Sequence, residues 1–178
     1  NPAKPKSIVK ISQSGSYNTM RVKDGSVYLL SDYYVTNDAK KKNVSWYVPE
    51  VQGKIMDAGD VYMPFDKMGN EYTVISSFSL SDPENKVDSK AVFGYGSICY
   101  VSQKNIYITE SDYNDNDENV TRTAIRKVSY KDGELKGVAQ TKINGTLNDS
   151  FSIDEYDGNL RVVTTVSNLG GDNGVMPL

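Results

Sequence analysis

Residues 150–165, SFSIDEYDGNLRVVTT, decide the fold that we predict for this chain. Two short runs of alternating apolar and polar residues flank Asp157 and Gly158. Alternation places every second side chain on the same face of a strand, and Asp-Gly readily adopts the positive φ angles of a two-residue hairpin turn. The stretch therefore predicts a β-hairpin that packs on the preceding part of the chain. The side chains expected at this contact are Phe151, Ile153, Leu160 and Val162.

The same hairpin pattern occurs twice more, at residues 17–31 around Asp24-Gly25 and at residues 97–109 around Lys104-Asn105. Each of these two hairpins is followed by an irregular excursion and then by a second pair of alternating runs. Four antiparallel strands per unit, repeated roughly every 40 to 50 residues, are typical of the blades of a β-propeller. We therefore predict an all-β chain that forms a partial β-propeller of four-stranded blades, about two of them complete and two in part.

The predicted units divide the chain into four parts. The N-terminal part should be the end of a blade, with a short strand that includes Ile8, Val9 and Ile11 and ends at Ser14-Gly15. A propeller closes its blades into a ring, so this chain is expected to be an open arc cut from a longer polypeptide. Exposed strand edges pair readily with other chains, which predicts edge-strand self-association of the arc. The boundaries are 1–14 for the blade end, 16–93 for a blade with an insertion at 36–70, 97–143 for the next blade, and 149–166 for a half blade.

The composition favours strands and limits the classes of partner that we expect. Among 178 residues there are 13 Tyr and 14 Gly but one Trp, and aromatic residues fit a pleated, half-buried surface. The net charge is −3 and the only basic run is 40–42, so we expect no nucleic-acid partner. No apolar run reaches the roughly 20 residues of a membrane-spanning helix, and we expect no membrane insertion. Cys99 lies in an alternating run and should pack as a small hydrophobic side chain.

The residue types in the chain give little indication of a catalytic site. The chain has no histidine, which removes Ser-His-Asp and Cys-His nucleophilic sites and the common zinc ligand sets. Paired carboxylates, as glycosidases use, are still available. No spacing brings two of them together, so we predict no catalytic residue. The candidates for such a pair are Asp57, Asp60, Asp66, Asp154 and Glu155.

Two excursions carry the candidate binding residues. The first, residues 36–70, is long for a loop without a function. Its aromatic side chains either form a stacking platform for a sugar or peptide or anchor the loop to its own blade. These residues are Trp46, Tyr47, Tyr62 and Phe65.

The second excursion, residues 111–119, is acidic. Its oxygen ligands are those that Ca²⁺ prefers, although the spacing of an EF-hand is not met. The alternative is a solvated hairpin tip that needs no cofactor. The candidate calcium ligands are Asp112, Asn114, Asp115 and Asp117.

Three stretches carry a resemblance to a known family: YTVISSFSL at 72–80, KAVFG at 90–94 and DEYDGNLRVVTT at 154–165. Over nearly its whole length the chain resembles bacterial and archaeal secreted proteins with a C-terminal β-propeller domain. The resemblance implies a propeller fold, a secreted or cell-surface location, and a longer parent protein that carries the remaining blades. It implies no activity, because none is established for that family.

From these observations we expect a non-enzymatic binding or scaffold module that recognises a protein or a glycan through its blade loops. A carboxylate-based hydrolase or lyase on a propeller scaffold is the alternative, since loops around such a scaffold can carry active sites. A purely architectural domain is the third possibility. Convergence of two carboxylates in a perturbed environment would favour the enzyme.

Overall fold

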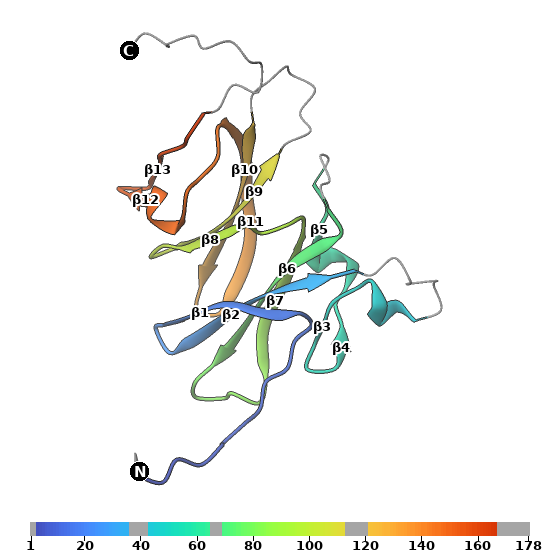
Figure 1. The fold of residues 1–178 in the computed structure, drawn as a ribbon. Coiled ribbons are helices and arrows are strands. Elements are labelled where there is room, and N and C mark those ends of the chain that lie inside the picture. The colour runs from blue at the N-terminus through green and yellow to red at the C-terminus, as the bar shows by residue number, and fades with distance from the viewer. Residues whose placement is uncertain (1–2, 36–42, 65–68, 113–120, 167–178) are drawn as a thin grey trace, which may run out of the picture.

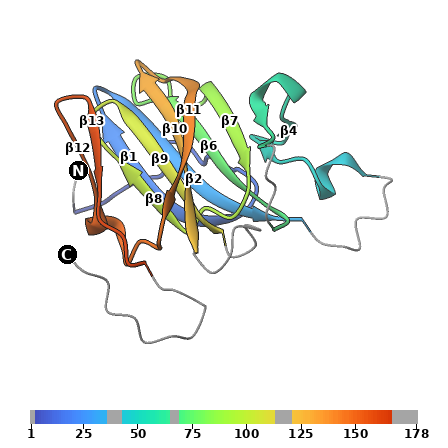
Figure 2. The same cartoon turned by 90° about the horizontal axis from the view of Figure 1, so that it is seen from above.

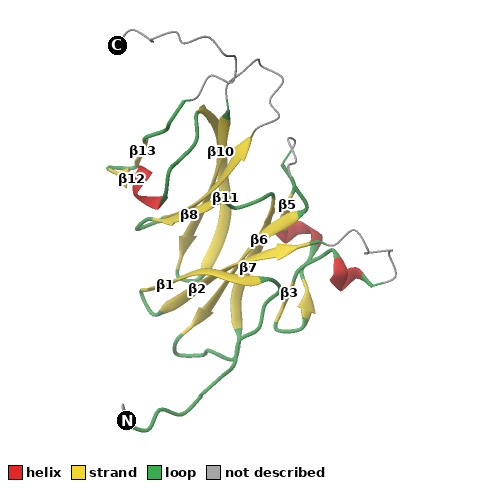
Figure 3. Cartoon of the chain, in the orientation of Figure 1, coloured by secondary structure: helices red, strands yellow, loops and turns green. Residues whose placement is uncertain are grey.

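The computed structural model describes residues 3–35, 43–64, 69–112 and 121–166. These residues form strands, turns and three one-turn 3₁₀ helices (Figure 3). None of the helices in the described ranges is long or apolar enough to cross a lipid bilayer. The prediction of an all-β chain is confirmed.

The first sheet contains an antiparallel four-stranded meander with a short fifth strand at its outer edge. The turn between its first two strands has φ angles of 47° at Asp24 and 76° at Gly25, as a type I′ hairpin requires. The predicted hairpin is therefore confirmed. In spatial order the strands are β1 (Ser16–Lys23), β2 (Ser26–Tyr34), β6 (Glu71–Ser79), β7 (Lys86–Phe93) and β5 (Val61–Tyr62).

The second sheet is a four-stranded antiparallel meander, and a two-stranded hairpin follows it along the chain. Figures 1 and 2 show the two sheets and the hairpin as successive parts of an arc that does not close. The hairpin turns through Asp157 and Gly158, both at positive φ, as predicted. The strands are β8 (Ile98–Val101), β9 (Asn105–Asp112), β10 (Arg122–Lys131), β11 (Glu134–Asn144), β12 (Ile153–Tyr156) and β13 (Asn159–Val162).

The two sheets pack face to face through a buried apolar cluster. Tyr28 of β2 and Tyr130 of β10 meet with ring centroids 4.5 Å apart. The Gly133 N–H donates to Tyr28 Oη at 3.0 Å, which ties the turn between β10 and β11 to the first sheet. Removing such side chains from water contributes about 1.5–3 kcal/mol for each large apolar residue. The buried members of the cluster are Tyr28, Leu30, Ile75, Val92, Ile106, Ile108, Val128, Tyr130 and Leu135.

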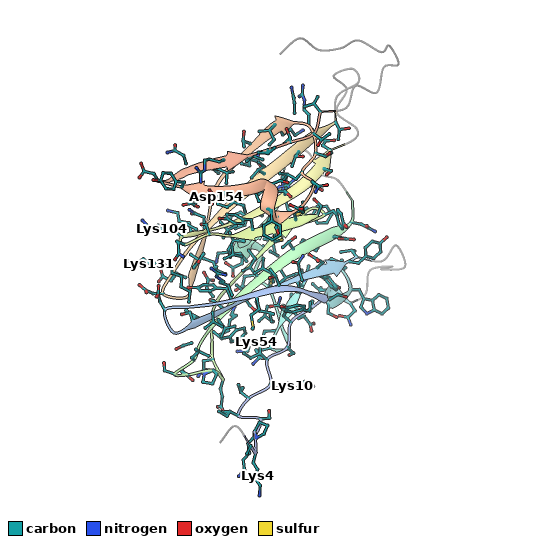
Figure 4. The ribbon with its side chains drawn as sticks, turned by 60° about the vertical axis from the view of Figure 1, so that its left-hand side comes forward. Lys4, Lys10, Lys54, Lys104, Lys131 and Asp154 are labelled. Carbon is teal, nitrogen blue, oxygen red and sulfur yellow. The ribbon has the colours of Figure 1, made fainter. Side chains whose placement is uncertain are left out.

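The hairpin turns of the two sheets gather on one side of the molecule. Figure 4 labels Lys104 and Lys131 there, with Asp154 of the β12–β13 hairpin further along the same side. Lys23 Nζ donates to the Gln103 carbonyl oxygen and lies over the ring of Tyr130. The turns of the first and second sheets are therefore in direct contact.

The described part of the first excursion covers the face of the first sheet that points away from the second sheet. Val51 and Met56 belong to the buried cluster on that face, together with Val74 and Phe78 of β6. The excursion contains η1 (Val44–Trp46), β3 (Glu50–Val51), β4 (Lys54–Ile55), η2 (Ala58–Asp60) and β5.

The N-terminal segment pairs with this excursion at residues 12–14, where Gln13 forms an antiparallel bridge with Val51 and the Ser14 N–H donates to the Glu50 carbonyl oxygen at 2.8 Å. The predicted strand is paired at residues 12–14, but residues 8–11 have no ladder partner and Ile8 is exposed, so the prediction is wrong for its first part.

One predicted packing contact of the C-terminal hairpin is also wrong. Ile153 is buried, and Leu160 and Val162 pack against the cluster that it shares with Tyr107, but the Phe151 side chain is 95% exposed. The reason is the 3₁₀ turn η3 (Ser150–Ser152), which Asp149 caps. Because the strand starts only at Ile153, the alternation that would turn Phe151 toward the second sheet does not extend to it.

Candidate ligand-binding site

A cavity of about 280 Å³ lies at the outer junction of the two sheets, where the first excursion meets β10 and β11. The excursion reaches it through β5, which runs parallel to β7 with Val61 opposite Ala91. Tyr62, together with the two residues that follow β5, borders the cavity on one side, and Val128 and Val138 border it on the other. The walls are therefore mainly apolar, as in most ligand pockets.

Tyr62 is held at the cavity by a close contact with Gly137. The Gly137 N–H donates to Tyr62 Oη at 3.1 Å, and a Cβ at this glycine would lie 2.8 Å from the ring. A bulge next to this contact, where β10 and β11 shift register between Lys127 and Val128, leaves Val138 without a direct cross-strand partner. Val138 is 53% exposed. The glycine and the bulge together keep the mouth of the cavity open.

A buried ion pair lies beside the cavity. Arg126 Nη2 lies 2.6 Å from Glu110 Oε2, and the two side chains are only 8% and 2% exposed. Glu110 Oε1 also accepts the Tyr95 N–H at 3.0 Å, and its carboxylate packs against Gly94, where φ is 136°. Both partners therefore sit in fixed positions with little access to bulk water.

Arg126 has donors that this pair does not use. Its Nε and Nη1 atoms are buried without a hydrogen-bond partner in the structure. The residue lines the junction cavity and also a second cavity of about 180 Å³, which Pro64 and Gln140 border. A buried donor without an acceptor costs about 1–3 kcal/mol. Two N–H groups of Arg126 are thus buried without an acceptor beside the apolar walls of the cavity.

The aromatic candidates from the first excursion occupy different surroundings. Trp46 and Tyr47 lie at η1 and are 51% and 36% exposed. The Tyr33 Oη–H holds η1 in place by donating to the Ser45 carbonyl oxygen at 2.7 Å. Tyr62 lies at the cavity instead. No ring contact between described residues joins Tyr62 to Trp46 or Tyr47. Phe65 falls outside the described residues.

Of the predicted calcium ligands, only Asp112 lies in a described segment. It is buried at the end of β9, and its Oδ2 accepts from Lys142 Nζ at 3.0 Å. Among the residues that the structure describes, no three His, Cys, Asp or Glu form a group that could hold a metal ion. Asn114, Asp115 and Asp117 fall outside these residues, so the calcium site stays a prediction.

Two carboxylates of the first excursion, Asp57 and Asp60, border one cavity of about 260 Å³ together with Glu84. Asp57 is exposed, Asp60 Oδ1 accepts from Lys90 Nζ at 2.8 Å, and Asp66 falls outside the described residues. Lys90 also donates to Asp88 at 2.9 Å, and Asp88 accepts the Leu135 N–H of the second sheet at 2.8 Å. Burial disfavours the ammonium, but the hydrogen bonds to both carboxylates outweigh it and raise the pKa of Lys90.

The carboxylates of the C-terminal hairpin attach it to the second sheet. Glu155 accepts from Ser102 Oγ at 2.6 Å, from Asn105 Nδ2 at 2.9 Å and from Tyr107 Oη at 2.8 Å. Burial opposes its charge, but these hydrogen bonds lower the pKa of Glu155. Its neighbour Asp154 pairs with Arg161, which lowers the pKa of that carboxyl.

The sequence analysis did not single out Asp32 and Glu71, which lie on the neighbouring strands β2 and β6. Burial raises the pKa of both carboxyls, and the charge of Asp32 raises that of Glu71 further. Cys99 packs against the core between the sheets as predicted, and burial raises the pKa of its thiol to about 12.

The sequence analysis also did not identify Arg126 and Glu110, although the sequence contains a pattern that indicates them. Each interrupts the apolar positions of its strand: Glu110 follows Ile106 and Ile108, and Arg126 precedes Val128. Opposite charges on the apolar faces of two successive strands indicate a buried pair, because unpaired charges are rarely buried.

A comparison with protein-family models finds one match, described as beta propeller domain, over residues 1–176. A comparison with curated proteins gives no match.

Proposed function

Because the chain belongs to the β-propeller domain family, we propose that it is a non-enzymatic binding module, secreted or held at the cell surface, that binds a protein or a glycan. The observation that carries the proposal is the junction cavity, where Arg126 presents two unpartnered donors between apolar walls. Specific sites commonly combine apolar walls with a few placed polar groups. The location rests on the resemblance of residues 72–80, 90–94 and 154–165 to secreted propeller proteins.

The surroundings of the described carboxylates favour binding over hydrolysis. Asp60 is engaged by Lys90, and Glu155 is engaged by side chains of the second sheet. A hydrolase needs two carboxyl groups that face one bond. Asp60, Asp154 and Glu155 are instead engaged in ion pairs or hydrogen bonds with neighbouring side chains.

One observation favours the alternative of a carboxylate-based hydrolase. Burial raises the pKa of both Asp32 and Glu71, and the charge of Asp32 raises that of Glu71 further; a carboxyl with a raised pKa can serve as a general acid. Assays with chromogenic glycosides test this alternative. We expect no turnover. If the unaltered chain hydrolyses a glycoside and the variants Asp32→Asn and Glu71→Gln do not, the hydrolase replaces the binding proposal.

Binding at the junction is tested with two variants that change similarly exposed apolar residues. Val138→Arg places a long charged side chain at the mouth of the cavity, whereas Val163→Arg changes an exposed residue beyond β13. Both variants and the unaltered chain are applied to arrays of cell-surface glycans and peptides, with folding checked by circular dichroism. Binding should be lost in Val138→Arg and kept in Val163→Arg. Equal binding by all three proteins would contradict the proposal.

A further inference from the structure

The charge of the junction site restricts the chemistry of its ligand. Arg126 already has a counter-charge, since Glu110 lies 2.6 Å away and both side chains are buried. A ligand with its own charge would add an unbalanced charge to a site with little water, and that is costly. The site therefore suits a neutral hydrogen-bond acceptor.

The geometry of the guanidinium restricts the ligand further. The free donors are Nε and Nη1, while Nη2 is occupied by Glu110. In the planar guanidinium these two atoms do not share a donor edge, because the side-chain Cδ lies between them. A single carboxylate therefore cannot bridge them. Two separate acceptor oxygens are needed, as the carbonyl groups of a peptide provide.

The outer edge of the second sheet borders the same cavity. β11 is the last strand of its sheet, and its first part is covered by the first sheet, because Asp88 accepts the Leu135 N–H and Tyr62 accepts the Gly137 N–H. From residue 138 to residue 141 every position is exposed. An exposed strand edge is a template for another extended chain.

In the first sheet, a short strand occupies the outer edge that corresponds to the exposed edge of β11. There the last strand of the meander, β7, is paired with the short parallel strand β5, with Tyr62 opposite Val92. The residues of β5 are apolar or aromatic, and those after it line the cavity. The protein itself therefore contains an example of an extended apolar segment added to the outer edge of a meander.

We infer that the ligand of this site is an extended, uncharged peptide segment that adds to the edge of β11 at residues 138–141. The inference rests on the proposed function and names the ligand class. An apolar side chain of the peptide enters the cavity between Tyr62 and Val138, and neutral carbonyl oxygens accept from Arg126. Main-chain hydrogen bonds provide affinity in this mode of binding, and the cavity provides specificity.

The test uses fluorescein-labelled octapeptides with blocked ends that carry a single Leu, Val or Phe among Ser, Thr and Asn residues. Binding to the full chain is measured by fluorescence anisotropy. For the best peptide, N-methylation of alternate amides should weaken binding about tenfold or more, because it removes main-chain donors worth about 1 kcal/mol each. Val138→Arg should abolish binding, and Val163→Arg should leave it unchanged.

The role of Arg126 is tested by the double variant Arg126→Met with Glu110→Gln. Glutamine keeps an acceptor for the Tyr95 N–H, and removing both charges avoids an unpaired buried ion. This variant should fold and bind the peptide about tenfold more weakly, which corresponds to a loss of about 1.4 kcal/mol of binding free energy. If it does not fold, Val138→Arg and the N-methylated peptides still decide the question.

A parallel measurement with uncharged oligosaccharides separates the two proposals. If oligosaccharides bind in a way that Val138→Arg abolishes while no peptide binds, the peptide inference is overturned and the proposed function stands. If neither ligand class binds, so that water alone fills the cavity, both are overturned. Peptide binding that N-methylation does not affect would also overturn addition to the β11 edge.

Discussion

The first sheet and the β12–β13 hairpin stand at opposite ends of the arc, and the chain covers them differently. On the outer face of the first sheet, Val51 and Met56 of the excursion bury Val74. At the hairpin, Phe151 and Val163 are 95% and 74% exposed. The comparison shows that the long excursion acts as a cover for an apolar sheet face, whereas the described part of the hairpin packs on one side, against the second sheet.

The largest expected effect comes from opening the covered end. Met56→Ala removes a side chain that is 7% exposed and should lower the free energy of unfolding by about 2–5 kcal/mol, since it leaves a cavity. Urea denaturation followed by circular dichroism measures the change. Phe151→Ala is the control at the other end and should change stability by about 0.5 kcal/mol or less. Similar losses in both variants would contradict the comparison.

A smaller effect is expected from detaching the hairpin. Glu155→Ala leaves the donors of Ser102, Asn105 and Tyr107 without their acceptor, which should cost about 1–3 kcal/mol. Hydrogen exchange should show faster exchange at β12 and β13 with little change in the first sheet. Asp154→Ala is the control, because its pair with Arg161 is exposed and its hydrogen bond from Tyr100 Oη is long, at 3.3 Å, so its loss should matter less. Loss of protection throughout the chain would mean that the hairpin is not an independent unit.

The smallest expected effect is a difference in pH dependence between the two ends. The pKa of Asp32 is raised, so its contribution to stability is present at acid pH and is lost as the pH rises through the folded-state pKa. The pKa of Glu155 is lowered, so its contribution is present above the unfolded-state pKa and is lost as the pH falls through the folded-state value.

These opposite signs are measured by urea unfolding between about pH 3 and pH 7. Asp32→Asn should change the free energy of unfolding more favourably near neutral pH than at acid pH. Glu155→Gln should instead reduce the loss of stability on acidification below the usual pKa of a glutamate. Profiles that keep the shape of the unaltered chain would show that neither carboxyl contributes.

The hairpins could be predicted because their signals are local. Asp24-Gly25 and Asp157-Gly158 adopt the positive φ angles that such turns require, and these angles depend on neighbouring residues alone. Phe151 shows the limit of this reasoning. Its position in the alternating pattern predicts burial, but Phe151 lies in the 3₁₀ turn that Asp149 caps, and the strand starts only two residues later, at Ile153.

The candidate site was predictable only in part. Tyr62 was chosen for its aromatic side chain and does line the cavity, yet Trp46 and Tyr47 were chosen for the same reason and lie at η1. Residue type alone cannot distinguish these positions. Arg126 was detectable as a charge on an apolar strand face, but its unused donors depend on where the neighbouring chain segments lie.

The sequence by itself determined most of the long strands, the Asp-Gly turns and the all-β class, because alternation and turn chemistry act over a few residues. Only the tertiary structure decided that the excursion covers one face of the first sheet and then delivers Tyr62 to the second. That contact joins Tyr62 to Gly137, 75 positions further along the chain. It requires two sheets to pack and a bulge to open beside them, and no local pattern specifies either event.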